Sequence, residues 1–301
     1  MLGGRFGEEP RRLSFQRLDR FAESGGRLVD TAHCYADGRS ERVIGEWMRA
    51  NPAVLAVADK IGHPANGAVD LSAARLRREL TESCERLGVA CVEAVLLHRD
   101  EPERAVPEVA ESLAGLVRDG HTHRIGVSNW PASRLEQLVD ELAGYGHRPL
   151  VSYQRSLAAP TTPLWPGALH TDDAVQAVAA RHELTLLAWA AHARGFFTGA
   201  TEPPTPGGGD PFDSAPNRAR RGRCRELARR CGERPETVAL AWLLHQPATW
   251  AVIGPRSVTE LDTSLRAARL PLDAGTLRWL AEPASDGAAV PAGRAAVENT
   301  G

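Results

Sequence analysis

SAARLRRELTESCERLGVACVEAVLLH (residues 72–98) holds one amphipathic segment followed by one short apolar run. Apolar side chains at helical spacing predict one buried helix face made of Leu76, Leu80, Cys84 and Leu87. Ser72 is a favourable N-cap for this helix, and Gly88 is a favourable end. The run from Val92 to His98 is mostly apolar, as in a parallel strand that is buried on both faces. A helix that leads into such a strand predicts an α/β fold.

The same alternation extends in both directions along the chain. Apolar runs rich in Val, Ile and Leu predict seven strands, at Arg27 to Asp30, Ala53 to Lys60, Val92 to His98, Arg124 to Asn129, Leu150 to Gln154, Thr185 to Ala190 and Trp250 to Gly254. Amphipathic patterns predict helices at Ser72 to Gly88, Pro107 to Asp119, Pro131 to Leu142, Asp172 to His182, Arg218 to Cys231, Pro235 to Gln246 and Val258 to Ala268.

This strand–helix repetition favours one fold class over another. A single-domain (β/α)8 barrel of the TIM type is the prediction, and a doubly wound parallel sheet is the alternative. No GxGxxG motif follows the first predicted strand, which argues against the alternative.

Composition and charge are those of an ordinary globular protein. Hydrophobic residues make up 43% and charged residues 25% of the 301 residues, with a formal net charge of −2. This charge does not indicate a nucleic-acid or membrane surface, and no apolar run approaches the length of a membrane span. The five cysteines form no CxxC pair. We therefore expect reduced thiols, a cytoplasmic protein and no metal site.

One basic residue differs from all the others. Lys and Arg total 36, yet Lys60 is the only lysine. A buried ammonium is compact and its pKa can be tuned, whereas arginine stays protonated. A surface position is the simpler interpretation, but Lys60 closes a predicted buried strand, which favours a functional role.

Other polar residues also lie where predicted strands end. Asp30 closes the first strand, Tyr35 follows five residues later, and His98 closes the third strand. In a parallel barrel the carboxyl ends of the strands open on one face, where the active sites of this architecture lie. We therefore expect Asp30, Tyr35, Lys60 and His98 to converge.

These four residue types suit the reduction of a carbonyl group. Hydride addition leaves an alkoxide that needs a proton, which the phenol of Tyr35 can donate. An ordinary phenol has a pKa of about 10, and the Lys60 ammonium is expected to lower it, since opposite charges ~4 Å apart interact by roughly 4 kcal/mol at an effective dielectric of about 20. Asp30 is expected to keep Lys60 charged and oriented. His98 is expected to hydrogen-bond the substrate oxygen.

Six stretches of the chain resemble a known family, between about Phe6 and Leu280. They are VDTAHCYADGRSERVIGEWM (from Val29), VADKIGHP (from Val57), EAVLLHRDEP (from Glu93), RIGVSNW (from Arg124), LLAWAAHARGFFTG (from Leu186) and VIGPRSVTEL (from Val252). Together they resemble the aldo-keto reductases. The resemblance implies Tyr35, Lys60, Asp30 and His98 as a catalytic tetrad, and NADPH as cofactor, with NADH not excluded.

The resemblance also implies a set of cofactor-binding residues. They are Ser128, Asn129, Ser152, Gln154, Trp189, Gly195, Phe196, Gly254, Arg256, Ser257 and Glu260. Trp189 replaces the tyrosine that usually stacks on the nicotinamide ring. Arg256 falls where the family holds the 2′-phosphate of NADPH, and an arginine fork suits a phosphate.

The chain departs from the family pattern at several positions. Ser152 falls where a glutamine is usual, and Gln154 lies on the same strand face and can substitute for it. Glu260 replaces a residue near the adenine, and a carboxylate there weakens the preference for NADPH. The sequence begins close to the end of the family's first strand, so we expect that strand to be truncated.

The expected organisation is a barrel over residues 1–285 and a flexible tail over residues 286–301. The expected function is reduction of an aldehyde or ketone, such as a sugar or a natural-product intermediate, with hydride from NADPH and a proton from Tyr35. The expected partner is a small carbonyl substrate, with no nucleic acid and no membrane. The alternative is a non-catalytic barrel subunit that senses the nicotinamide cofactor and binds a protein partner. The sequence leaves monomer and homo-oligomer open.

Overall fold

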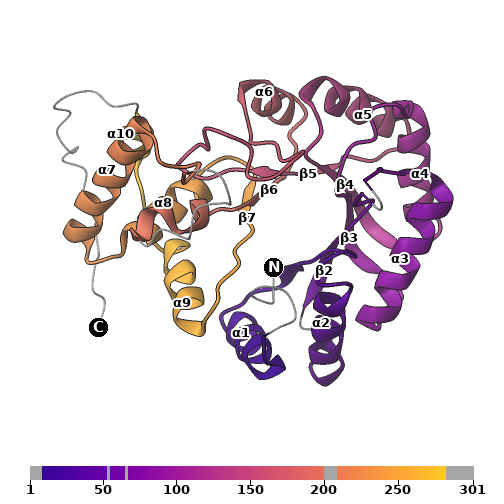
Figure 1. The fold of residues 1–301 in the computed structure, drawn as a ribbon, viewed down its shortest axis with the longest axis horizontal. Helices are drawn as coiled ribbons and strands as arrows, with labels where there is room; N and C mark the ends of the chain where they lie inside the picture. Colours follow the sequence, from indigo (N-terminus) through magenta and orange to yellow (C-terminus); the bar gives the residue numbers. More distant parts are fainter. Residues whose placement is uncertain (1–8, 53–54, 65–66, 200–208, 283–301) are drawn as a thin grey trace. The chain divides into compact units, whose positions relative to one another are not determined.

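Strands and helices alternate through the computed structural model (Figure 1). The structure describes residues 9–52, 55–64, 67–199 and 209–282. The strands are β1 (Leu28–Asp30), β2 (Ala56–Ile61), β3 (Val92–Leu97), β4 (Thr122–Ser128), β5 (Leu150–Gln154), β6 (Leu186–Trp189) and β7 (Thr249–Ala251). The helices are α1 (Arg11–Glu23), α2 (Arg39–Ala50), α3 (Ala73–Leu87), α4 (Val106–Arg118), α5 (Ala132–Gly144), α6 (Asp173–Arg181), the 3-10 helix η1 (Ala193–Thr198), α7 (Ala215–Cys231), α8 (Pro235–Leu244), α9 (Val258–Ala267) and α10 (Ala274–Ala281).

The order of the strands decides between the two predicted folds. Within the described residues the strands form one sheet in chain order, from β1 to β7. Each neighbouring pair from β1 to β5 is parallel, which requires a crossover between strands. A doubly wound sheet reverses its strand order at a switch point, and no reversal occurs here. The (β/α) barrel class is therefore confirmed.

The chain divides into two compact units. The first comprises Met1–Tyr153, Thr171–Leu187 and Gly254–Val258. The second comprises Gln154–His170, Ala188–Ile253 and Thr259–Gly301. The remnant of the family's first strand, which was expected at the N-terminus ahead of β1, lies outside the described residues. The expected tail over residues 286–301 also lies outside them.

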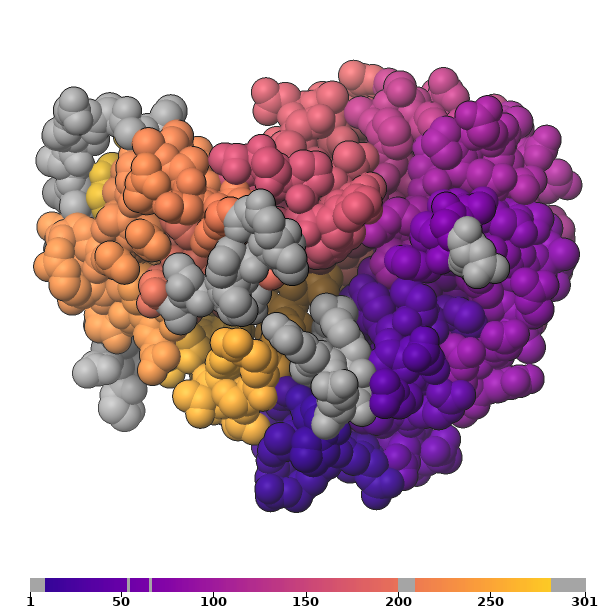
Figure 2. All heavy atoms as spheres, in the orientation of Figure 1, coloured from indigo at the N-terminus to yellow at the C-terminus, as the bar shows by residue number. Residues whose placement is uncertain are grey.

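In the first unit, helices α3 to α5 cover the outer face of the strands (Figure 1). Leu76, Leu80 and Leu87 of α3 are fully buried, as their spacing predicts. Gly45 of α2 allows a close approach to α3, because a Cβ atom there would lie 2.5 Å from the carbonyl oxygen of Leu87. In the space-filling view most of this unit belongs to the indigo to magenta part of the chain, whose atoms form one contiguous surface (Figure 2).

The second unit is built around an almost entirely apolar helix, α8. Its residues from Thr237 to Ala241 are all buried. The indole of Trp242 donates to the carbonyl oxygen of Leu277 at 3.1 Å, which ties α8 to α10. Val252 donates its N–H to the carbonyl oxygen of Ala188 at 2.9 Å and so joins the chain after β7 to β6. No described helix has both the length and the apolar composition that a membrane span needs.

Among the helices of the described residues, α1, α2, α10 and the 3-10 helix η1 escaped prediction. The inward face of α1 shows why, because it buries Ser14 and Arg17 beside Leu18. Polar residues on the buried side hide the apolar periodicity on which the prediction depends. Ser72 does precede α3, but its side chain makes no capping hydrogen bond, and its N–H instead donates to Asp70 Oδ1 at 2.9 Å.

Candidate active site

Strand pairing in the first unit places predicted site residues on one face of the sheet. Lys60 pairs with Leu96, and Leu96 pairs with Gly126. Partners in neighbouring strands face the same side, and so do residues two positions further along a strand. Ser128 therefore shares the Lys60 face, together with its partner Ser152.

Lys60 is buried and held by two acceptors. It is 4% exposed, forms an ion pair with Asp30, and donates from Nζ to the carbonyl oxygen of Thr31 at 3.2 Å. Nζ lies 5.4 Å from the centroid of the Tyr35 ring. Burial acts to lower the pKa of Lys60, but Asp30, with smaller contributions from Tyr35 and Asp59, raises the pKa above its ordinary value. The ammonium is therefore charged at neutral pH.

Tyr35 lies between the ammonium and an imidazole. Its ring centroid is 5.7 Å from that of His98, in an edge-to-face arrangement. Burial raises the pKa of Tyr35 above its ordinary value, and the Lys60 charge only partly opposes this. The sequence-based expectation of a lowered phenol pKa is therefore wrong for the protein without ligands, because desolvation outweighs the ammonium. The phenol is fully protonated at neutral pH.

His98 follows β3 directly and completes the cluster. Its N–H donates to the carbonyl oxygen of Ile61 at 2.7 Å, and its ring is 4.9 Å from that of His63. Burial lowers the pKa of His98 well below its ordinary value, and the Lys60 charge adds to this effect. Cys34 Sγ lies 3.7 Å from His98 Nδ1, and burial raises the pKa of this thiol to about 11. A neutral imidazole therefore faces a neutral thiol.

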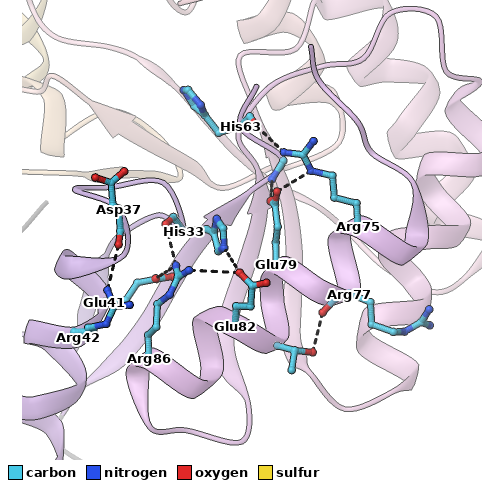
Figure 3. A network of polar contacts seen from close by, with 12 residues as sticks. His33, Asp37, Glu41, Arg42, His63, Arg75, Arg77, Glu79, Glu82 and Arg86 are labelled. Carbon is cyan, nitrogen blue, oxygen red and sulfur yellow. Dashed lines mark hydrogen bonds and ion pairs between the residues drawn. The ribbon is translucent and has the colours of Figure 1, made fainter. Parts of the chain in front are cut away.

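Helix α3 fixes the loop that carries Tyr35 (Figure 3). Arg86 donates to the carbonyl oxygen of His33 at 3.1 Å and forms an ion pair with the fully buried Glu41 at 2.8 Å. His33 Nε2 lies 2.9 Å from Glu82 Oε2. These contacts hold the loop two residues before Tyr35.

The same helix fixes the segment after Lys60 (Figure 3). Glu79 Oε2 accepts the N–H of Gly62 at 2.7 Å. Arg75 donates to Glu79 Oε1 at 2.7 Å and to the carbonyl oxygen of His63 at 3.1 Å. Buried, charge-assisted hydrogen bonds of this kind keep a site in one geometry.

Ser128, Asn129 and Ser152 form a polar patch where β4 ends beside β5. Asn129 adopts a left-handed backbone (φ +61°), which asparagine tolerates better than most residues. It donates from Nδ2 to Ser128 Oγ at 2.7 Å and from its N–H to the carbonyl oxygen of Ser152 at 3.1 Å. Ser152 Oγ is buried and finds no hydrogen-bond partner in the described part of the chain. An unpaired buried hydroxyl is costly, so the patch fits a ligand that brings its own polar group, such as a carboxamide.

The segment with Gly254, Arg256 and Ser257 also lies in the first unit, where all three residues are exposed. Arg17 of α1 holds this segment, although no sequence pattern singles out this residue. Its side chain is 1% exposed and donates to the carbonyl oxygens of Pro255 and Arg256, at 3.1 and 2.9 Å. Glu9 pairs with the same guanidinium. Arg17 therefore orders the segment that the resemblance assigns to a phosphate.

The remaining expected cofactor residues belong to the second unit. Trp189 ends β6, and Trp165 stacks on it with ring centroids 4.7 Å apart. Gly195 has φ +87°, and the buried ring of Phe196 carries the Arg221 guanidinium 4.6 Å from its centroid. Gln154 and Glu260 are the other two expected cofactor-binding residues of this unit. Gln154 donates to Ser156 Oγ at 3.1 Å, and the carbonyl oxygen of Glu260 accepts from Ser264 Oγ at 2.9 Å.

Comparison with known proteins identifies the family of the chain. The Aldo/keto reductase family model matches residues 1–282. The chain is 28% identical over 291 residues to a protein of Bacillus subtilis (strain 168) named uncharacterized oxidoreductase YrpG, covering 89% of this chain and 86% of that one. It is 26% identical over 295 residues to norsolorinic acid reductase A of Aspergillus parasiticus, covering 93% and 74%.

Solved structures share the fold. A crystal structure of an aldo/keto reductase from Klebsiella pneumoniae in complex with NADP and acetate superposes with a TM-score of 0.70 at 21% identity, covering 90% of this chain and 84% of that one. The family match spans nearly the whole chain, so the protein belongs to the aldo/keto reductase family of oxidoreductases.

Proposed function

We propose that the protein reduces an aldehyde or ketone to the alcohol, with NADPH as hydride donor and Tyr35 as proton donor. The observation that carries this proposal is the cluster of Tyr35, Lys60, Asp30 and His98 in one compact unit, with the ammonium beside both carboxylate and phenol. The narrower proposal is that the substrate is a sugar or a natural-product intermediate.

Each member of the cluster has a distinct task in this reaction. NADPH, when bound, supplies the hydride that attacks the carbonyl carbon. The protonated phenol of Tyr35 donates its proton to the carbonyl oxygen as negative charge develops there. Lys60, kept charged by Asp30, stabilises the tyrosinate that remains. The neutral imidazole of His98 donates a hydrogen bond to the same oxygen and orients the substrate.

The choice of cofactor has two supports. Ser152 Oγ, which has no hydrogen-bond partner among the described residues, lies beside Ser128 and Asn129 and is the proposed contact for the nicotinamide carboxamide. The Klebsiella pneumoniae structures that share the fold are described as complexes with NADP and with NADPH. Arg256 is the proposed contact for the 2′-phosphate.

The direct test is a fluorescence titration of the protein with NADPH and with NADH, followed by a screen of aldehydes and ketones for oxidation of NADPH. We expect saturable binding, tighter for NADPH, and turnover of at least part of the panel. Failure to bind either nucleotide contradicts the proposal. Binding without turnover, together with stable association with another protein, supports the non-catalytic alternative.

Replacing Arg17 tests the assignment of the phosphate segment. In Arg17→Met two charge-assisted hydrogen bonds to the Pro255 and Arg256 carbonyls are lost. We expect NADPH affinity to fall about tenfold, the effect of one such hydrogen bond, and NADH affinity to fall much less. Arg12→Met, on the exposed side of α1, is the matched control. Equal losses for the two nucleotides indicate loosening of the fold and argue against a role at the phosphate.

A further inference from the structure

Arg99 follows His98 and forms no ion pair with an acidic side chain of the described residues. Its guanidinium is half-buried and donates to the carbonyl oxygen of His98 at 2.8 Å. Within the described ranges this backbone oxygen is its one hydrogen-bond acceptor, and no carboxylate forms an ion pair with it. A guanidinium has five N–H donors, so most of its capacity is unused.

The nearby acids cannot serve Arg99, because other groups hold them. Asp100 accepts two hydrogen bonds from Arg134, at 2.7 and 3.0 Å. Glu101 accepts from Arg104 Nε and from the N–H of Leu71, each at 2.7 Å. Among Arg99, Asp100 and Glu101, only Arg99 therefore lacks an oppositely charged partner in the described part of the chain.

The charge of Arg99 also acts on the catalytic cluster. Burial lowers the pKa of Arg99, while Tyr35 and Cys34 act in the opposite sense. Burial and then Lys60 lower the pKa of His98, and Arg99 adds to them. Arg99 is thus close to the groups that meet the substrate carbonyl, and it carries a partly desolvated positive charge.

A half-buried cation without a counter-ion is unfavourable unless a ligand supplies one. We propose that Arg99 binds an anionic group of the substrate, so that the preferred substrates are aldehydes or ketones that carry a carboxylate. This inference rests on the proposed function and adds a substrate class to it. The planar guanidinium matches a carboxylate in a bidentate pair, which gives direction as well as attraction.

The test compares two aldehydes that differ in charge and share the reacting group, 4-carboxybenzaldehyde and methyl 4-formylbenzoate. For the unmodified protein with NADPH we expect kcat/KM to be about tenfold higher for the carboxylate, the effect of one charge-assisted hydrogen bond. In Arg99→Gln this ratio is expected to fall close to one. The ratio is taken within each variant, so a general loss of activity cancels.

Three further variants complete the design. Arg99→Lys keeps the charge and is expected to keep most of the preference, and Arg99→Glu is expected to reverse it in favour of 4-(trimethylammonio)benzaldehyde. Arg148→Gln, which removes an exposed arginine paired with Glu183, is the matched control and should leave the ratio unchanged.

The possible outcomes separate this inference from the proposed function. Turnover of neither aldehyde by the unmodified protein, within a panel that gives no turnover at all, counts against the proposed function. Turnover of the ester without preference for the carboxylate overturns the inference alone. A preference that survives both Arg99→Gln and Arg99→Glu also overturns it.

Discussion

Tyr35→Phe is expected to reduce carbonyl turnover about a thousandfold, within the range that general acid catalysis contributes. The substitution removes only the phenol oxygen, and with it the proton that the developing alkoxide needs. The ring that packs edge-on to His98 is retained, so the site should keep its shape. NADPH affinity should change less than twofold in the fluorescence titration, because no cofactor contact is assigned to the Tyr35 hydroxyl.

The other tyrosines of the chain provide matched controls. Tyr145 is 45% exposed, and Tyr145→Phe should affect neither turnover nor stability. Tyr153 is buried, and its hydroxyl donates to the carbonyl oxygen of Trp130 at 2.6 Å. Tyr153→Phe should lower the free energy of unfolding by about 1 kcal/mol, as expected for one hydrogen bond, while the rate of proton donation is kept. Full turnover in Tyr35→Phe would remove Tyr35 from the mechanism.

The cluster could be predicted because it depends on strand order and strand ends. Asp30, Lys60 and His98 each close an apolar run, and parallel strands in chain order bring such ends together. The single lysine in an arginine-rich chain pointed to the same place. Neither argument needs knowledge of side-chain packing, which explains why the proximity of these side chains could be expected from the sequence.

Other features depend on packing and could not be predicted. Asp59 precedes Lys60, but strand alternation turns it to the opposite face, where it is fully buried. Burial and the nearby Glu41 raise the pKa of Asp59 well above its ordinary value. The expectation that the pKa of Tyr35 is lowered was wrong for the same reason. The sequence shows a neighbouring charge but does not show how much water is excluded from the site.

Contacts between segments that are distant in the sequence also could not be predicted. Arg17 and the carbonyl of Arg256 are separated by 239 positions, and Arg134 pairs with Asp100 across 34. Charge patterning within one segment does not indicate such partners. Arg99 could be recognised as unpaired only after Asp100 and Glu101 were seen to be occupied.

Lys60→Met is expected to lower both the rate of carbonyl turnover and the free energy of unfolding, and the two effects have different causes. Activity should fall at least a hundredfold, since a preorganised positive charge that stabilises the transition state is lost. Stability should fall by about 3 kcal/mol, because the substitution leaves the Asp30 carboxylate, which is only 11% exposed, without its partner. Urea unfolding at neutral pH measures the second effect, and turnover of the favoured aldehyde measures the first.

The double variant Asp30→Asn/Lys60→Met distinguishes the two effects. It removes both charges, so the cost of an unpaired buried carboxylate disappears and most of the lost stability should return. Turnover should stay as low as in Lys60→Met, because the ammonium next to Tyr35 is still absent. If the double variant recovers both stability and turnover, Lys60 serves only to neutralise Asp30. If it recovers stability alone, the Lys60 charge acts on the Tyr35 phenol during proton transfer.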